Sequence, residues 1–117
     1  MRDLGVSIKI DKNEIHIIGQ GLFNLNKPEN VINVGNSGTL IRLLTGILVT
    51  QKFTSSITGD SSLRSRPMER IIKPLNEIGA HIESDKSRAP LTIVPKKELS
   101  PIKYVQEIAS AQIKSCL

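Results

Sequence analysis

Apolar and polar positions alternate near the start of the chain in a way that predicts a β-hairpin. Residues 6–10 alternate strictly, and residues 14–18 repeat the alternation after a polar turn at residues 11–13. Such alternation is typical of half-buried strands, with one face toward a core. A further short apolar run at residues 31–34 leads directly into glycines and small polar residues, and we expect a short strand there.

Two later segments carry apolar residues at helical spacing. Residues 40–51 form the first, and the adjacent pair Asn36-Ser37 offers a side chain to cap its amino end. Residues 67–78 form the second, in which Pro74 predicts a kink or a break. Gly79 is suited to end this helix, because glycine accepts the left-handed conformation common after a last turn.

The remaining segments complete an alternating order of strands and helices. We expect strands at 53–58, 80–83, 91–94 and, more weakly, 103–107, a polar loop at 59–66, a charged turn at 84–88 and a final helix at 109–117. From residue 31 onward the order is strand, helix, strand, helix, strand, strand. Such an order makes a sheet with helices packed on it, so the predicted fold class is α/β (α+β).

Composition places the chain among small globular proteins. Its 117 residues, of which 38% are hydrophobic, are enough for one modest domain. The single cysteine, Cys116, excludes an internal disulfide and a multi-cysteine metal site. No apolar run approaches the roughly 20 residues of a membrane helix, and residues 1–5 lack the apolar stretch of a secretory signal. We therefore expect a cytoplasmic protein that does not bind a membrane.

The charge balance favours anionic partners. Lysine and arginine number 16 against 11 acidic residues, which gives a net charge of +5. A basic surface attracts nucleic acid, anionic membranes or small anionic substrates, and net charge does not choose between them. The three aromatic residues are scattered, however, whereas proteins that bind single-stranded nucleic acid stack bases on aromatic clusters. This argues against a nucleic-acid partner.

The first candidate site is the junction at residues 35–39, Gly-Asn-Ser-Gly-Thr, which we call the first junction. It joins a predicted strand to a predicted helix. Small residues let a ligand approach the backbone, and the start of a helix presents unpaired N–H groups to phosphate or carboxylate. The sequence is neither a Walker loop nor a dinucleotide-binding fingerprint. The alternative is a tight capped turn without a ligand.

Two further junctions resemble the first in character. The second junction, residues 59–68, carries Arg64 and Arg66, whose guanidinium groups suit phosphate or carboxylate; a solvated polar loop is the alternative. The third junction, residues 109–115, follows a predicted strand and offers serine and glutamine; a capped helix is the alternative. In α/β proteins such junctions lie at the carboxyl ends of strands, where ligands bind. No general base or nucleophile stands out, and Asp60 is the one acid within these segments.

Three ordered motifs carry a resemblance to a known family. They are Asn-Val-Gly-Asn-Ser-Gly-Thr (residues 33–39) followed by Arg42, Gly-Asp-Ser-Ser-Leu-Arg-Ser-Arg-Pro-Met (59–68) and Ala-Ser-Ala-Gln-Ile-Lys-Ser (109–115). Together they resemble the EPSP synthases (3-phosphoshikimate 1-carboxyvinyltransferases), most closely the second, glyphosate-tolerant bacterial class. The resemblance implies a two-domain inside-out barrel of six βαβαββ units, in which residues 1–117 are part of one substrate-binding domain at the N-terminal side.

The family's activity implies the chemistry of the site. EPSP synthases transfer the enolpyruvyl group of phosphoenolpyruvate to the 5-hydroxyl of shikimate 3-phosphate and release phosphate, in the shikimate pathway to aromatic amino acids, without a metal or organic cofactor. By the resemblance, phosphoenolpyruvate would contact Asn36, Gly38, Arg66 and Gln112, and shikimate 3-phosphate would contact Ser110, Ala111 and Gln112. Both substrates are polyanions, for which arginine and helix-start N–H groups are the expected partners.

Two departures from the family pattern affect these expectations. Position 38 is glycine where tolerant members carry alanine, which predicts room for glyphosate. The family's amino-terminal Lys-Ser…Arg motif has no counterpart, and its proton-transfer groups belong to the second domain. We therefore expect a fragment without catalytic residues of its own, inactive alone, from a monomeric parent enzyme. Strand edges left unpaired in a fragment favour self-association.

Two alternatives remain open from the sequence. One is a relative of the enolpyruvyl transferase that acts on UDP-N-acetylglucosamine, which shares the fold and the chemistry but lacks this pairing of Arg-Pro-Met with Ser-Ala-Gln. The other is a non-enzymatic basic α/β binding module, for which retention on heparin or RNA with a steep salt dependence would be diagnostic.

Overall fold

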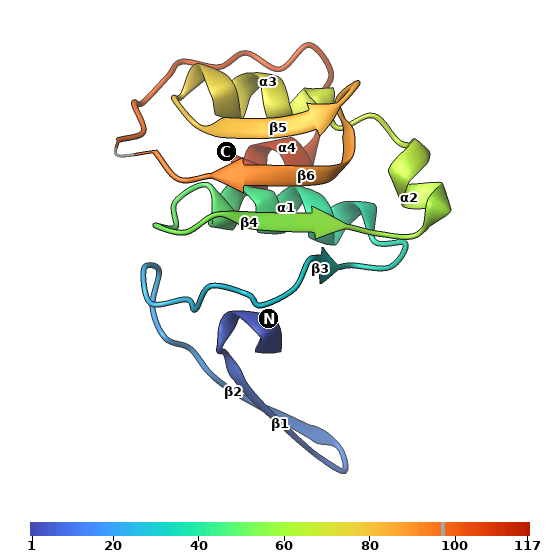
Figure 1. The fold of residues 1–117 in the computed structure, drawn as a ribbon, viewed down its shortest axis with the longest axis vertical. Coiled ribbons are helices and arrows are strands. Elements are labelled where there is room, and N and C mark those ends of the chain that lie inside the picture. Colours follow the sequence, from blue (N-terminus) through green and yellow to red (C-terminus); the bar gives the residue numbers. More distant parts are fainter. Residues whose placement is uncertain (97) are drawn as a thin grey trace.

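The chain folds into a four-stranded sheet with helices on one face and a separate two-stranded hairpin, as the computed structural model of residues 1–96 and 98–117 shows (Figure 1). The strands are β1 (Ser7–Asp11), β2 (Glu14–Ile18), β3 (Ile32–Asn33), β4 (Ser55–Thr58), β5 (His81–Asp85) and β6 (Arg88–Val94). The helices are a short 3₁₀ turn (Arg2–Leu4), α1 (Gly38–Leu48), α2 (Ser61–Ser65), α3 (Glu69–Glu77) and α4 (Ala111–Cys116).

The order of the four-stranded sheet is β3-β4-β6-β5, with β3 and β4 parallel and the other neighbours antiparallel. α1, α3 and α4 lie behind the sheet in Figure 1. From residue 31 the elements follow the predicted α/β order, with α2 added. The parallel pairing of β3 and β4 matters for function, because it brings the segments that follow them to the same end of the sheet.

The core lies between the sheet and its helices. Alternate residues of the inner strands, including Ile57, Leu91 and Ile93, are fully buried against apolar residues of α1 and α3 such as Ile41 and Ile71. This alternation gives the sheet one apolar face. Removal of such side chains from water is the main stabilising contribution to a domain of this size.

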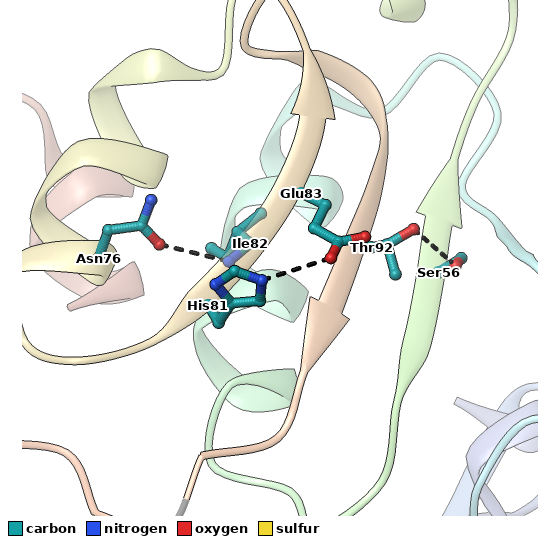
Figure 2. A network of polar contacts seen from close by, with 6 residues as sticks. All are labelled: Ser56, Asn76, His81, Ile82, Glu83 and Thr92. Atoms are coloured by element: carbon teal, nitrogen blue, oxygen red, sulfur yellow. Dashed lines mark hydrogen bonds and ion pairs between the residues drawn. The ribbon is translucent and has the colours of Figure 1, made fainter.

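The opposite face of the sheet is polar (Figure 2). Ser56 and Thr92 are cross-strand partners whose hydroxyl oxygens lie 3.0 Å apart, and the imidazole Nε2 of His81 lies 3.3 Å from Glu83 Oε1 two residues along β5. Beside this face, the Asn76 side-chain oxygen of α3 accepts a hydrogen bond from the Ile82 N–H at 3.3 Å. The helices therefore cover one side of the sheet, and polar side chains occupy the other.

The predicted hairpin is confirmed, but the prediction that its strands are half-buried is wrong. Ile8 pairs with Ile17 and Ile10 with Ile15, which puts four isoleucines on one face. Ile10, Ile15 and Ile17 are 63–66% exposed. The cause is the place of the hairpin, which projects away from the four-stranded sheet (Figure 1). Alternation identifies an apolar face, but it does not supply a surface to cover it.

The predicted cap of the first helix and the predicted glycine stop of the second are confirmed, while the predicted break does not occur. Ser37 caps α1, its hydroxyl oxygen accepting the Leu40 N–H at 3.1 Å. Gly79 ends α3 with φ of 100°. The N–H groups of Gly79 and Ala80 donate back to carbonyls in the last turn, at 3.0 and 2.9 Å. α3 nevertheless continues past Pro74 to Glu77, because Pro74 is itself buried in the core and its packing offsets the missing hydrogen bond.

Three predicted segments differ from the structure. The polar loop at 59–66 contains α2, which Asp60 caps and buried Leu63 anchors. Residues 103–107 do not form a strand; this part of the chain runs along the helical layer, where the Ser100 N–H donates to the Ile78 carbonyl at 2.7 Å. The last helix begins at Ala111 rather than 109. Of the helices in the described residues, none is long and apolar enough to cross a membrane.

Candidate functional site

The first and second junctions lie side by side because β3 and β4 are parallel. The Val34 N–H donates to the Thr58 carbonyl at 2.9 Å, and the Asp60 N–H donates to the Gly35 carbonyl at 3.0 Å. Gly59 permits this close approach, since a Cβ at that position would overlap the Gly35 carbonyl oxygen and the Leu63 side chain. The glycines of both junctions thus serve the contact between the two segments.

A chain of polar side chains crosses between these junctions. The Asn36 amide donates from Nδ2 to Asp60 Oδ2 at 2.8 Å, and its Oδ1 accepts a short hydrogen bond from Arg66 Nη2. Arg66 Nη2 also donates to Ser62 Oγ at 3.3 Å. Arg66 is therefore held from two sides at the edge of the first junction, with the rest of its guanidinium group available to a ligand.

Asp60 is an ionised structural carboxylate rather than a proton donor. Its Oδ1 accepts the Leu63 N–H at 2.8 Å, which caps α2. The Leu63 N–H, followed by the Asn36 amide, lowers the pKa of the Asp60 carboxyl below its ordinary value of 3.8. The acid that the sequence singled out therefore holds the site together.

The third junction reaches the other two through helix packing and not from the end of a strand. The prediction that it follows a strand is wrong, because the chain before Ser110 is irregular. α4 packs against α1 instead, with the backbone of Cys116 directly beside Gly46. This contact carries Gln112 to the amino end of α1.

Gln112 bridges the third junction to the first. Its Nε2 donates to Thr39 Oγ1 at 2.8 Å, and its Oε1 accepts from Arg42 Nη1 at 3.1 Å across 70 positions of sequence. The same Nη1 donates to the Gly38 carbonyl at 2.9 Å. Partial burial, and then the nearby charges of Arg66 and Arg70, lower the pKa of the Arg42 guanidinium, which remains charged at neutral pH.

Gly38 lies at the point where these groups meet. A Cβ built on Gly38 would lie 3.0 Å from Nη1 of Arg42 and 3.0 Å from Nη1 of Arg66. Two guanidinium groups therefore approach one buried backbone position, and the contact distance leaves no slack for a methyl group. The resulting patch is strongly positive and presents several N–H donors.

Ser110 and Ala111 occupy the start of α4. The Ser110 hydroxyl oxygen accepts the Ile113 N–H at 3.4 Å, while the Ser110 N–H donates to Gln106 Oε1 at 2.9 Å. The hydroxyl proton of Ser110 remains available to a ligand. Ala111 has no polar side chain, so any contact it makes to an anion goes through its backbone N–H in the first turn.

The structure thus joins four of the six predicted residues in one network, in which Arg42 links Gln112 to Gly38, and sets the other two beside them. Asn36, Gly38, Arg66 and Gln112 belong to one connected set. Sequence reasoning did not find the part that Thr39 and Arg42 play in holding Gln112. Arg42 follows Gly38 by four positions, a spacing that places it above that glycine only when the helix begins at residue 38, as α1 does, and not at residue 40 as predicted. Arg64 is exposed in the last turn of α2 and forms none of these contacts.

Comparison with known proteins agrees with this geometry. The whole chain, residues 1–117, matches the family described as EPSP synthase (3-phosphoshikimate 1-carboxyvinyltransferase). The chain belongs to the EPSP synthase family. It is 47% identical over 116 residues to the 3-phosphoshikimate 1-carboxyvinyltransferase of Ruthia magnifica and 46% identical over 117 residues to that of Legionella pneumophila. Each alignment covers 99% of this chain and 27% of the relative.

A solved structure supports the same assignment for the fold. EPSP synthase from Acinetobacter baumannii superposes with a TM-score of 0.93 at 48% identity, over 98% of this chain and 27% of that protein. The chain therefore spans about a quarter of the length of the EPSP synthases it matches. In residues 1–96 and 98–117, no three His, Cys, Asp or Glu side chains are grouped so as to hold a metal ion.

Proposed function

We propose that this chain forms part of the substrate-binding surface of an EPSP synthase, one that transfers the enolpyruvyl group of phosphoenolpyruvate to the 5-hydroxyl of shikimate 3-phosphate. The observation that carries this proposal is the convergence of Arg42, Arg66 and Gln112 at Gly38. In the part of the chain that the structure describes, neither arginine forms an ion pair with a carboxylate. Unpaired guanidinium groups at one position favour a polyanionic ligand.

Phosphoenolpyruvate suits the side of the patch that Arg66 forms. Asn36 and Ser62 hold one nitrogen of this guanidinium group, which orients its planar fork. A fork held in this way can donate two parallel hydrogen bonds to phosphate or carboxylate. Asp60, whose oxygens already accept from Asn36 and Leu63, stabilises Asn36 and through it Arg66.

Shikimate 3-phosphate suits the side that α4 forms. The Ser110 hydroxyl, the backbone N–H groups of the first turn and the Gln112 amide offer neutral donors to a phosphate group and a sugar-like ring. Gln112 lies between the two sides, since its amide contacts the first junction. The described residues offer arginines, amides and hydroxyls here, which bind anions but are poor groups for moving protons at neutral pH.

A hybrid enzyme tests the proposal. This chain would replace the matching segment of the Acinetobacter baumannii EPSP synthase, to which it is 48% identical, and phosphate release would be measured with both substrates. We expect activity, and we expect Arg66→Ala to lower kcat/KM for phosphoenolpyruvate by about a hundredfold, since charge-assisted hydrogen bonds are worth roughly 1.5–3 kcal/mol each. Lys52→Ala, which removes an exposed cation beyond the other end of α1, is the matched control. A folded hybrid without activity, or an unaffected Arg66→Ala variant, would contradict the proposal.

The chain alone is the second test. We expect no phosphate release above background, because the described residues of this surface offer arginines, amides, hydroxyls and a carboxylate already held by Asn36 and Leu63, and turnover would refute this expectation. Weak binding of shikimate 3-phosphate should raise the melting temperature. Retention on heparin or RNA with a steep salt dependence would instead favour a nucleic-acid binding module. Turnover of UDP-N-acetylglucosamine by the hybrid would favour the sister transferase.

A further inference from the structure

We propose that Arg42 is a positioning residue that, together with Thr39, fixes the orientation of the Gln112 side-chain amide and so decides which of its atoms faces shikimate 3-phosphate. The inference rests on the proposed function for the identity of the ligand. The evidence for the orientation itself is independent of the ligand and comes from three hydrogen bonds around Gln112, Thr39 and Gly38.

The identity of the partners dictates the orientation of the amide. A guanidinium group has donors and no acceptor, so only the carbonyl oxygen of Gln112 can face Arg42 Nη1, 3.1 Å away. The amide nitrogen then faces Thr39 Oγ1 at 2.8 Å. A flipped amide would put an N–H against a guanidinium N–H and an oxygen against Thr39. The flip therefore loses one charge-assisted hydrogen bond and creates a donor–donor contact.

The fixed orientation leaves one N–H of Gln112 without a partner in the described residues. One hydrogen of Nε2 goes to Thr39, and no second acceptor contacts that nitrogen. A free donor beside the Arg66 patch suits an anion, whereas the carbonyl oxygen of a flipped amide would repel it. The orientation thus converts a side chain that both donates and accepts into one that presents only a donor.

Arg42 is itself held in place for this task. It lies one helical turn after Gly38 on α1, and its Nη1 donates to the Gly38 carbonyl at 2.9 Å as well as to Gln112. It is half-buried, and its positive neighbours Arg66 and Arg70 resist its movement toward them. No carboxylate competes for its donors among the described residues. Among the described residues, the one hydrogen bond that Arg42 makes outside α1 is the bond to Gln112.

The test uses nuclear magnetic resonance on the 117-residue chain, with the side-chain amide protons of Gln112 as the signature. These resonances are assigned by their loss in Gln112→Glu. In the wild type we expect the proton donated to Thr39 to be shifted and protected from exchange, while the other proton, which has no partner in the described residues, is not. In Arg42→Met and in Thr39→Val the two Gln112 amide resonances should move to the chemical shifts of an unbonded glutamine side chain. Thr39→Ser keeps the hydroxyl and should therefore keep the wild-type chemical shifts. The buried Gln51 amide, with its own hydrogen bonds to Leu22 and Ile47, reports an intact fold.

Titration with shikimate 3-phosphate gives the functional readout. We expect Arg42→Met and Thr39→Val to weaken binding about tenfold, the size of one hydrogen bond of roughly 1.4 kcal/mol. Thr39→Ser and the distant Lys52→Met should bind like the wild type. Thr39 is exposed, and valine has the same shape as threonine, so we expect Thr39→Val to fold. This variant therefore still tests the proposal if Arg42→Met does not fold.

The outcomes separate the inference from the proposed function. If the two Gln112 amide resonances stay unchanged in Arg42→Met and in Thr39→Val, the inference is overturned, whether or not the chain binds a ligand. Gln112 resonances at the chemical shifts of an unbonded glutamine, together with an unchanged affinity for shikimate 3-phosphate, would overturn the positioning role of Arg42. If the wild-type chain does not bind shikimate 3-phosphate, the binding expected of the chain alone is contradicted and the hybrid enzyme decides the proposed function, while the amide signature still decides whether Arg42 fixes Gln112.

Discussion

The backbone of Gly46 in α1 lies directly against the carbonyl oxygen of Cys116 in α4. A Cβ at position 46 would overlap that oxygen and lie 2.9 Å from the Cys116 carbonyl carbon. The contact sets the distance between the two helices. Because α4 carries Ser110, Ala111 and Gln112 at its amino end, this distance also determines whether Gln112 reaches Thr39 and Arg42.

We predict that Gly46→Ala destabilises the chain. Alanine gains about 1 kcal/mol over glycine inside a helix, but the overlap is with backbone atoms that cannot rotate away, and overpacking of this kind costs about 1–3 kcal/mol. The net loss should be up to about 2 kcal/mol in urea unfolding, accompanied by faster hydrogen exchange in α4. Gly19→Ala is the matched control, since no atom lies within 4 Å of its Cβ position. A stabilised Gly46→Ala variant would show that the helices are not in contact.

We predict an alkaline loss of stability that depends on Cys116. Burial raises the pKa of the Cys116 thiol from its ordinary value of 9.0 to about 11. Between about pH 9 and pH 11 the unfolded chain releases this proton and the folded chain keeps it, so rising pH favours unfolding. Wild type should therefore lose more stability than Cys116→Ala across this range. Because both proteins contain the same lysines, the difference between their free energies of unfolding in urea does not depend on lysine titration. If the two free energies change in parallel with pH, the thiol is not protonated and buried.

Acid should weaken the second junction through Asp60. Hydrogen bonds from the Leu63 N–H and Asn36 lower the pKa of this carboxyl below 3.8, so its charged form stabilises the fold. That contribution is complete above the unfolded pKa and is lost as pH falls through the folded one. The stability difference between wild type and Asp60→Asn should shrink below about pH 4. A difference that is constant down to about pH 2 would mean that the carboxylate is not held by these bonds.

We predict that Gly38→Ala weakens glyphosate binding in the hybrid enzyme. The added methyl group would lie 3.0 Å from Nη1 of both Arg42 and Arg66, so both guanidinium groups must shift from the positions that would bind the ligand. A shift of this kind should raise the glyphosate inhibition constant about tenfold, or roughly 1.4 kcal/mol. Stability should change little, because the obstacles are the ends of flexible side chains. Equal inhibition constants for the two forms would contradict the prediction.

The sequence was sufficient to predict those elements whose apolar residues follow a clear period or whose ends carry a capping serine or a terminating glycine. α1 has apolar residues at helical spacing and a serine cap, and α3 ends at a glycine with positive φ, as expected. α2 was missed because its five residues contain one apolar side chain, Leu63, which sets no period. The exposed state of the isoleucines in β1 and β2 was missed because alternation carries no information on what covers a face.

The candidate site likewise has one part that the sequence could predict and one part that it could not. The first two junctions come together through a parallel pair of strands, which the order of elements implies. The contact of Gln112 with Arg42 spans 70 positions and depends on how closely two helices pack. Nothing in either segment specifies that distance except Gly46, whose role becomes clear only when Cys116 lies against it.

The polar outer face of the sheet offers a place to attach a reporter. Glu83 and Thr92 point away from the helices (Figure 2), and Glu83 is exposed. The only native cysteine is buried with a raised pKa, so it should react slowly with thiol reagents at neutral pH. A cysteine introduced at position 83 would therefore take up a fluorescent dye selectively. Such a label would follow events at the arginine patch from the far side of the sheet without touching any residue of the site.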